Sequence, residues 1–108
     1  MIIGTAYYPE HWSRERWETD CRLMRDMGIN TVRMGEFGWS VMEREEGKYD
    51  FSLYDEAIDL MGRYGISVIL GTPTATPPAW LCQKYPDIYM KDRQGIVRGF
   101  GSRRHYCY

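Results

Sequence analysis

Short apolar runs alternate with amphipathic segments along the first seventy residues, and this alternation limits the folds open to the chain. Runs at residues 2–6, 29–34 and 66–70 each have the length and composition of a buried β-strand. The segments between them carry apolar residues at helical spacing. Strand–helix–strand units connected in this way favour a parallel sheet. The sequence therefore predicts an α/β fold built from βα units.

The first predicted helix has a start signal and a stop signal. Ser13 is a candidate N-cap, and Gly28 lies where a left-handed backbone would end the helix. The apolar face of this helix is predicted to consist of Trp17, Cys21, Met24 and Met27.

The second predicted helix begins at a possible capping box formed by Ser52 and Asp55. Arg63 lies in its last turn and Gly65 follows as the cap. Its apolar face is predicted to consist of Leu53, Ala57, Leu60, Met61 and Tyr64. The run at 66–70 after it is apolar throughout, which is typical of a parallel strand covered on both faces.

Two parallel architectures compete, and the segment after the first strand separates them. A doubly wound nucleotide-binding fold needs a glycine-rich turn there, but the chain has YYPEHW instead. A (β/α)8 barrel remains, and such a barrel takes ~250 residues. The predicted fold class is therefore α/β, namely the N-terminal segment (about three βα units) of a (β/α)8 TIM barrel. Residues 1–108 are expected to form one incomplete domain.

Charge and cysteine usage exclude several functions and suggest a compartment. The net charge is −1, so no global field attracts nucleic acid or an anionic membrane. No stretch approaches the ~20 apolar residues of a membrane span, and the start does not resemble a signal peptide. Three cysteines without a C-x-x-C pair favour a reducing, cytoplasmic location.

Six motifs in order along the chain resemble glycoside hydrolase family 42, the β-galactosidases. They are YYPEHW, VRMGEFGWS, EGKYDF, LGTPTATPPAWL, YPDIY and FGSRRHYC. The resemblance implies a (β/α)8 catalytic barrel that hydrolyses terminal β-galactosides with retention of configuration, using two carboxylates ~5–5.5 Å apart. It also implies an acid/base Glu in an Asn-Glu pair after the fourth strand and a nucleophile after the seventh. The chain contains no Asn-Glu pair, so no catalytic residue is assigned and the 108 residues alone are expected to be inactive.

The resemblance does assign two residues near the end of the chain. It places the family's galactose-binding arginine at Arg103, whose guanidinium offers several donors to sugar hydroxyls. A loop ion pair, or the same role taken by Arg104, is the alternative. It also makes Cys107 the first of four cysteine ligands to a structural zinc found in some members, against the alternative of a buried free thiol. No catalytic cofactor is expected, and the full-length enzyme is expected to be a homotrimer.

Glu36 is a tempting catalytic carboxylate because it follows the second predicted strand. The favoured interpretation is that it bonds to loop backbone or to Arg33 and shapes the floor of the site. Its neighbours Glu43, Glu45 and Glu46 are interpreted as part of a solvated loop. Trp80, after two prolines, is expected to pack a short helix onto the barrel rather than to bind sugar.

Two other functions stay open at the level of sequence. One is a related barrel glycosidase of different specificity, such as an α-L-arabinopyranosidase or a β-fucosidase. The other is an inert carbohydrate-binding fragment. An Asn-Glu pair within a few tens of residues after Tyr108 would favour an enzyme.

Overall fold

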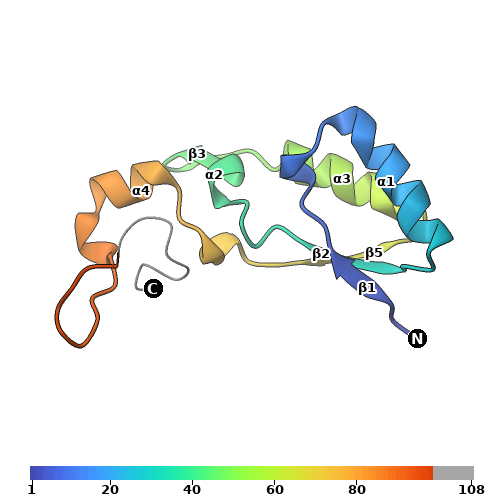
Figure 1. Cartoon of the computed structure of the whole chain (residues 1–108). Helices are drawn as coiled ribbons and strands as arrows, with labels where there is room; N and C mark the ends of the chain where they lie inside the picture. Colours follow the sequence, from blue (N-terminus) through green and yellow to red (C-terminus); the bar gives the residue numbers. More distant parts are fainter. Residues whose placement is uncertain (99–108) are drawn as a thin grey trace.

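A computed structural model describes residues 1–98, which fold around a three-stranded parallel sheet (Figure 1). Its strands are β1 (Gly4–Ala6), β2 (Thr31–Met34) and β5 (Ser67–Leu70), in the order β1-β2-β5. In the register, Thr5 lies opposite Val32, and Val32 lies opposite Val68. The predicted parallel sheet of three strands is confirmed.

Two helices cover one face of this sheet (Figure 1). They are α1 (Arg14–Asp26) and α3 (Ser52–Arg63). The alternation within β2 explains the arrangement, because Val32 and Met34 are fully buried toward the helices while Arg33 between them is exposed. The main buried contributions from the helices come from Trp17, Cys21 and Met24 of α1 and Tyr54, Ala57 and Met61 of α3.

The predicted helix ends are partly confirmed. Gly28 and Gly65 both have positive φ, at 80° and 71°, and follow the helices as expected. Ser13 is the N-cap of α1, but its side chain makes no capping hydrogen bond. The predicted capping box of Ser52 is wrong: Ser52 is the first helical residue of α3, and its backbone N–H donates to Asp50 Oδ1 over 3.0 Å.

Two expectations about burial are also wrong. Met27, the C-cap residue of α1, is 75% exposed although it was expected on the apolar face. The strand β5 is not covered on both faces, since Ile69 is 55% exposed. It is an outer strand of the described sheet, and α1 and α3 lie on the other face (Figure 1).

The long loops after β2 and β5 contain structure of their own. The first holds α2 (Trp39–Met42) and a hairpin of β3 (Glu43–Glu45) and β4 (Lys48–Tyr49). The second holds α4 (Ala79–Lys84) between two 3₁₀ turns, at Pro73–Ala75 and Pro86–Ile88. A further 3₁₀ turn, Pro9–His11, follows β1. None of the helices that the structure describes has the length and apolar composition needed to cross a lipid bilayer.

Candidate functional site at the strand ends

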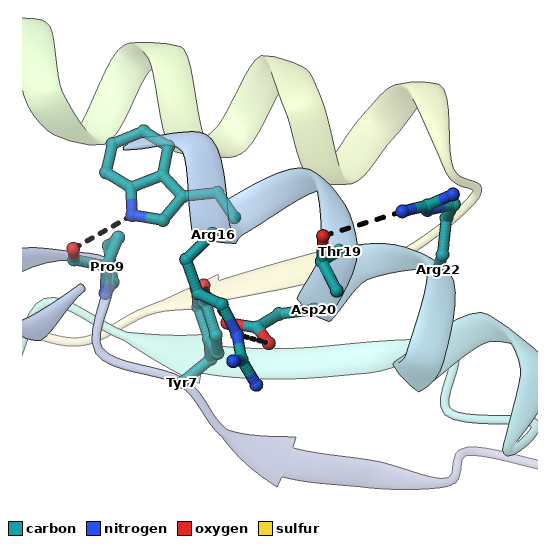
Figure 2. A network of polar contacts seen from close by, with 7 residues as sticks. Tyr7, Pro9, Arg16, Thr19, Asp20 and Arg22 are labelled. Carbon is teal, nitrogen blue, oxygen red and sulfur yellow. Dashed lines mark hydrogen bonds and ion pairs between the residues drawn. The ribbon is translucent and has the colours of Figure 1, made fainter. Parts of the chain in front are cut away.

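Tyr7 and Tyr8 follow β1 directly, and their hydroxyl groups donate hydrogen bonds to two different carboxylates. Tyr7 is buried and donates to Asp20 Oδ2 over 3.0 Å, while Arg16 Nε donates to Asp20 Oδ1 over 2.7 Å (Figure 2). Burial, and then this hydrogen bond, raises the pKa of Tyr7. The hydroxyl therefore stays a donor at working pH, and the contact ties the end of β1 to α1.

Tyr8 donates a hydrogen bond to Glu36, a residue that follows β2. Glu36 Oε1 accepts from the Tyr8 hydroxyl over 3.2 Å and forms an ion pair with Arg33 Nε at 3.0 Å. The expected bond to Arg33 is thus confirmed, and the carboxylate joins the ends of two neighbouring strands. Because the chemistry of parallel α/β folds gathers at the carboxyl ends of the strands, Glu36 lies on the functional side of the sheet.

Two more side chains complete what we call the strand-end cluster, namely Tyr8, Glu10, Arg33, Glu36 and Tyr54. Both carboxylate oxygens of Glu10, Oε2 of Glu36 and the hydroxyl of Tyr54 are buried without a partner of good hydrogen-bond geometry. Burying such groups unpaired costs free energy. The cluster is therefore where the described residues keep unused hydrogen-bonding capacity.

Glu43 organises the loop after β2. It is only 6% exposed, and Oε2 accepts from the indole N–H of Trp39 over 2.7 Å while Oε1 accepts from the backbone N–H of Gly47 over 2.8 Å. The bond from Trp39, followed by that from Gly47, lowers the pKa of Glu43. The interpretation of Glu43 as a solvated loop carboxylate is wrong, because these donors hold it inside the turn of the hairpin.

The hairpin in turn holds α4. The indole N–H of Trp80 donates to the backbone oxygen of Glu43 over 2.9 Å. Glu46, at the hairpin turn, pairs with Lys84 and accepts from the Tyr85 hydroxyl over 2.9 Å. Trp80 thus joins α4 to the hairpin, whereas its expected packing against the barrel stays a prediction, and the loops after β2 and β5 form one unit beside the strand ends.

The two residues assigned by resemblance, Arg103 and Cys107, lie outside the described residues. Within residues 1–98, no three His, Cys, Asp or Glu side chains come together as ligands for a metal ion. Cys21 and Cys82 are buried free thiols, and Cys21 faces Met61 Sδ at 3.5 Å in the core. The described residues therefore do not fit a zinc centre by themselves.

Sequence reasoning missed Glu10, Tyr54 and the buried state of Glu43. The burial of Tyr54 could have been predicted, because residues 54, 57 and 61 lie on one face of a helix, just as residues 53, 57 and 60 do. Glu43 is held by donors only four residues away on either side, Trp39 and Gly47, and the sequence interpretation overlooked this local pattern.

The parallel sheet with helices on one face matches the N-terminal region of solved (β/α)8 barrels, so the chain is of the α/β barrel class. The sequence profile of glycoside hydrolase family 42, described as β-galactosidase, matches residues 6–108. This chain belongs to that family.

Individual relatives agree with this assignment. The chain is 51% identical to a β-galactosidase of Thermus thermophilus over 99% of its own length and 17% of that protein's. It is also 51% identical to β-galactosidase BgaH of Haloferax lucentense, covering 100% of this chain and 16% of that protein.

Solved structures match as closely. The β-galactosidase of the Antarctic haloarchaeon Halorubrum lacusprofundi has a TM-score of 0.93 at 52% identity, over 99% of this chain and 16% of that one. The β-galactosidase of the psychrophilic Marinomonas ef1 has a TM-score of 0.91 at 52% identity, over 98% of this chain and 16% of that one. The chain thus spans about a sixth of the length of these relatives.

Proposed function

We propose that the protein containing this chain is a retaining β-galactosidase that hydrolyses terminal, non-reducing β-D-galactosyl residues. The observation that carries the proposal is the match of nearly the whole chain, at 52% identity and a TM-score of 0.93, to a solved β-galactosidase. The unused acceptors at the strand ends support it, because they lie where barrel enzymes bind substrate.

The residues of this chain would build part of the sugar site rather than perform the bond cleavage. Retention needs a nucleophile and an acid/base carboxylate ~5–5.5 Å apart, and Glu36 does not fit either role well because its Oε1 is engaged by Tyr8 and Arg33. Glu36 instead fixes the ends of β1 and β2. Arg103 would donate from its guanidinium to galactose hydroxyls, a charged fork that a lysine cannot reproduce.

The experiment compares Arg103→Ala with its neighbour Arg104→Ala in the whole protein, using one aryl β-galactoside. Hydrogen bonds to a charged group contribute ~1.5–3 kcal/mol, so Arg103→Ala should lower kcat/KM by roughly ten- to a hundred-fold. Arg103→Lys should restore little of it, and Arg104→Ala should cost less activity. A larger loss in Arg104→Ala would show that the assignment is displaced by one residue.

The same assay tests the specificity. Aryl α-L-arabinopyranoside and aryl β-fucoside are offered beside the galactoside, and the galactoside should have the highest kcat/KM. A higher value for either competitor would replace the proposed substrate while leaving a glycosidase in place. No turnover of any of the three by the folded protein would overturn the enzyme assignment.

Three further properties remain proposals that rest on family membership. Cys107 would contribute one thiolate to a zinc site whose other ligands come from outside this chain. The whole protein would assemble as a homotrimer, and it would work in the cytoplasm. Zinc content, light scattering and cell fractionation test these three in turn.

A further inference from the structure

Glu36 uses one of its two carboxylate oxygens and leaves the other free. Its side chain is only 15% exposed. Oε1 accepts from the Tyr8 hydroxyl and forms an ion pair with Arg33, whereas Oε2 is buried and has no hydrogen-bond partner among residues 1–98. A buried acceptor of this kind calls for an explanation of what holds it in place. The explanation begins with the turn that carries Glu36.

Glu36 lies in a tight turn between β2 and α2. The backbone N–H of Gly38 donates to the carbonyl oxygen of Gly35 over 2.9 Å and closes this turn. Gly35 has φ 93°, a left-handed conformation that favours glycine, and a methyl group there would lie 2.8 Å from Cδ1 of Leu70. Glycines therefore set the path of the backbone before and after Glu36.

Gly71 contacts the Glu36 side chain from the loop after β5. Its backbone N–H donates to the carbonyl oxygen of Met34 over 2.8 Å, and the N–H of Ala75 donates to the carbonyl oxygen of Glu36 over 3.3 Å. A methyl group added at position 71 would lie 3.2 Å from Cβ of Glu36, closer than ordinary van der Waals contact. The backbone of Gly71 is not left-handed. Space, and not conformation, therefore favours glycine at this position.

Tyr54 contacts the last residue of the same turn from the helix layer. It is only 2% exposed. A methyl group at position 38 would lie 1.9 Å from the Tyr54 hydroxyl oxygen and 2.6 Å from Cζ of the ring. Gly38 has φ −90°, which other residues adopt easily. The Tyr54 ring therefore lies directly against the backbone of Gly38, and the absence of a side chain there makes the contact possible.

We propose that Tyr54 and Gly71 are positioning residues that hold the turn of Glu36 by contact and so fix its free carboxylate oxygen at the mouth of the sugar site. The far end of this side chain is held at Oε1 by Tyr8 and Arg33. The near end is limited at Cβ by Gly71. With both ends held, Oε2 has little freedom left. Only the link to sugar rests on the proposed function; the contacts themselves are tested without activity.

The first test needs no substrate and measures thermal midpoints of the whole protein. Gly38→Ala should lower the midpoint by several degrees, because the new methyl group overlaps the Tyr54 ring. Tyr54→Phe in the same background should recover part of this loss, and Tyr54→Leu should recover most of it, since leucine has no atoms where the hydroxyl and Cζ lie. An equal cost of Gly38→Ala in all three backgrounds would disprove the contact and overturn the proposal.

The second test uses kcat/KM for an aryl β-galactoside and asks whether Gly71 acts through Glu36. Gly71→Ala should displace the Glu36 side chain by a few tenths of an ångström and lower kcat/KM by roughly three- to ten-fold. In a Glu36→Ala background, which has no carboxylate to displace, Gly71→Ala should cost little more. An unchanged kcat/KM in the single variant, or losses that multiply in the double variant, would overturn the positioning role.

The matched control is Gly62→Ala. Gly62 lies exposed in α3, and a methyl group there meets nothing within 4 Å. This variant should leave kcat/KM unchanged and keep or slightly raise the midpoint, because alanine favours a helix more than glycine does.

A further variant covers the case in which Gly71→Ala does not fold. Glu36→Gly removes the Cβ that the new methyl group meets, so the pair should fold again; no recovery would overturn the proposal. The midpoints need no substrate. A protein that shows the midpoint pattern of the first test but hydrolyses no galactoside would therefore refute the proposed function and leave the contacts standing.

Discussion

The neighbouring hydroxyls of Tyr7 and Tyr8 lead to two clusters of opposite character. On the helix side, one carboxylate oxygen of Asp20 accepts a hydrogen bond from Tyr7 and the other accepts one from Arg16 (Figure 2). At the strand ends, Oε1 of Glu36 accepts from Tyr8 and pairs with the charge of Arg33, while Oε2 has no hydrogen-bond partner. Two adjacent tyrosines thus bind two different carboxylates: one has both oxygens hydrogen-bonded, and the other has one oxygen without a partner.

The difference separates residues that hold the fold from residues that are available for recognition. A satisfied carboxylate between β1 and α1 stabilises their packing and has nothing left to offer a ligand. A buried acceptor without a donor costs stability, and such costs are concentrated where function requires them. The contrast predicts that changes around Asp20 affect stability, whereas changes in the strand-end cluster affect activity and its dependence on pH.

The largest expected effect on stability in this comparison comes from Asp20→Ala. The change leaves the buried Tyr7 hydroxyl without its acceptor, which should lower the free energy of unfolding by about 1–3 kcal/mol. Asp20→Asn keeps an acceptor oxygen and should cost less. Urea unfolding of the whole protein measures both.

The control is Asp26→Ala on the same helix, because Asp26 is exposed and only loosely paired with Arg25. Its effect should stay within about 0.5 kcal/mol. If Asp20→Ala keeps its stability but loses kcat/KM, the division between a structural and a recognition cluster is wrong.

Glu43 shows whether a position near the strand ends or a missing hydrogen-bond partner matters more. It lies in a strand-end loop, yet both of its carboxylate oxygens accept hydrogen bonds. A carboxylate whose pKa is lowered by folding adds stability above its ordinary pKa of about 4.3, and this stability is lost as the pH falls through the folded value. Glu43→Gln should therefore cost about 1 kcal/mol at pH 7 and less near pH 3.

Urea midpoints at the two pH values measure the effect of Glu43→Gln. The control is Glu45→Gln in the same hairpin, where the exposed pair with Lys48 should contribute little at either pH. A cost that does not change with pH would mean that the shape of the Glu43 side chain matters and its charge does not.

Much of the fold follows from the sequence because its determinants are local. The three strands, both long helices and the two glycine ends depend on apolar spacing and on a backbone conformation that glycine adopts easily. The capping box failed although it is also local. Asp50, two residues before Ser52, accepts the backbone N–H of Ser52 in its place.

The strand-end site was harder to predict because its determinants are distant in the chain. The bond from Arg33 to Glu36 spans three residues and was expected. The bond from Trp80 to the backbone oxygen of Glu43 spans 37 residues, and the bond from Tyr8 to Glu36 spans 28. A charged residue in a polar stretch resembles a solvated one until such a partner is placed. Arg103 and Cys107 stay predictions.

The smallest expected signal comes from Cys21, which is fully buried beside Asp20 in α1. Burial, and then the charges of Asp20 and Glu18, raises the pKa of its thiol to about 11. At pH 8 only about one thiol in a thousand would be ionised even if it were reached. Iodoacetamide at pH 8 should therefore leave Cys21 unmodified in the native protein and label it after unfolding, as peptide mass spectrometry would show. Asp20→Ala should speed native labelling because the contact between β1 and α1 opens more often, whereas Tyr54→Phe should speed it less. Equal acceleration by the two variants would show that the two clusters open together and would end the distinction between them.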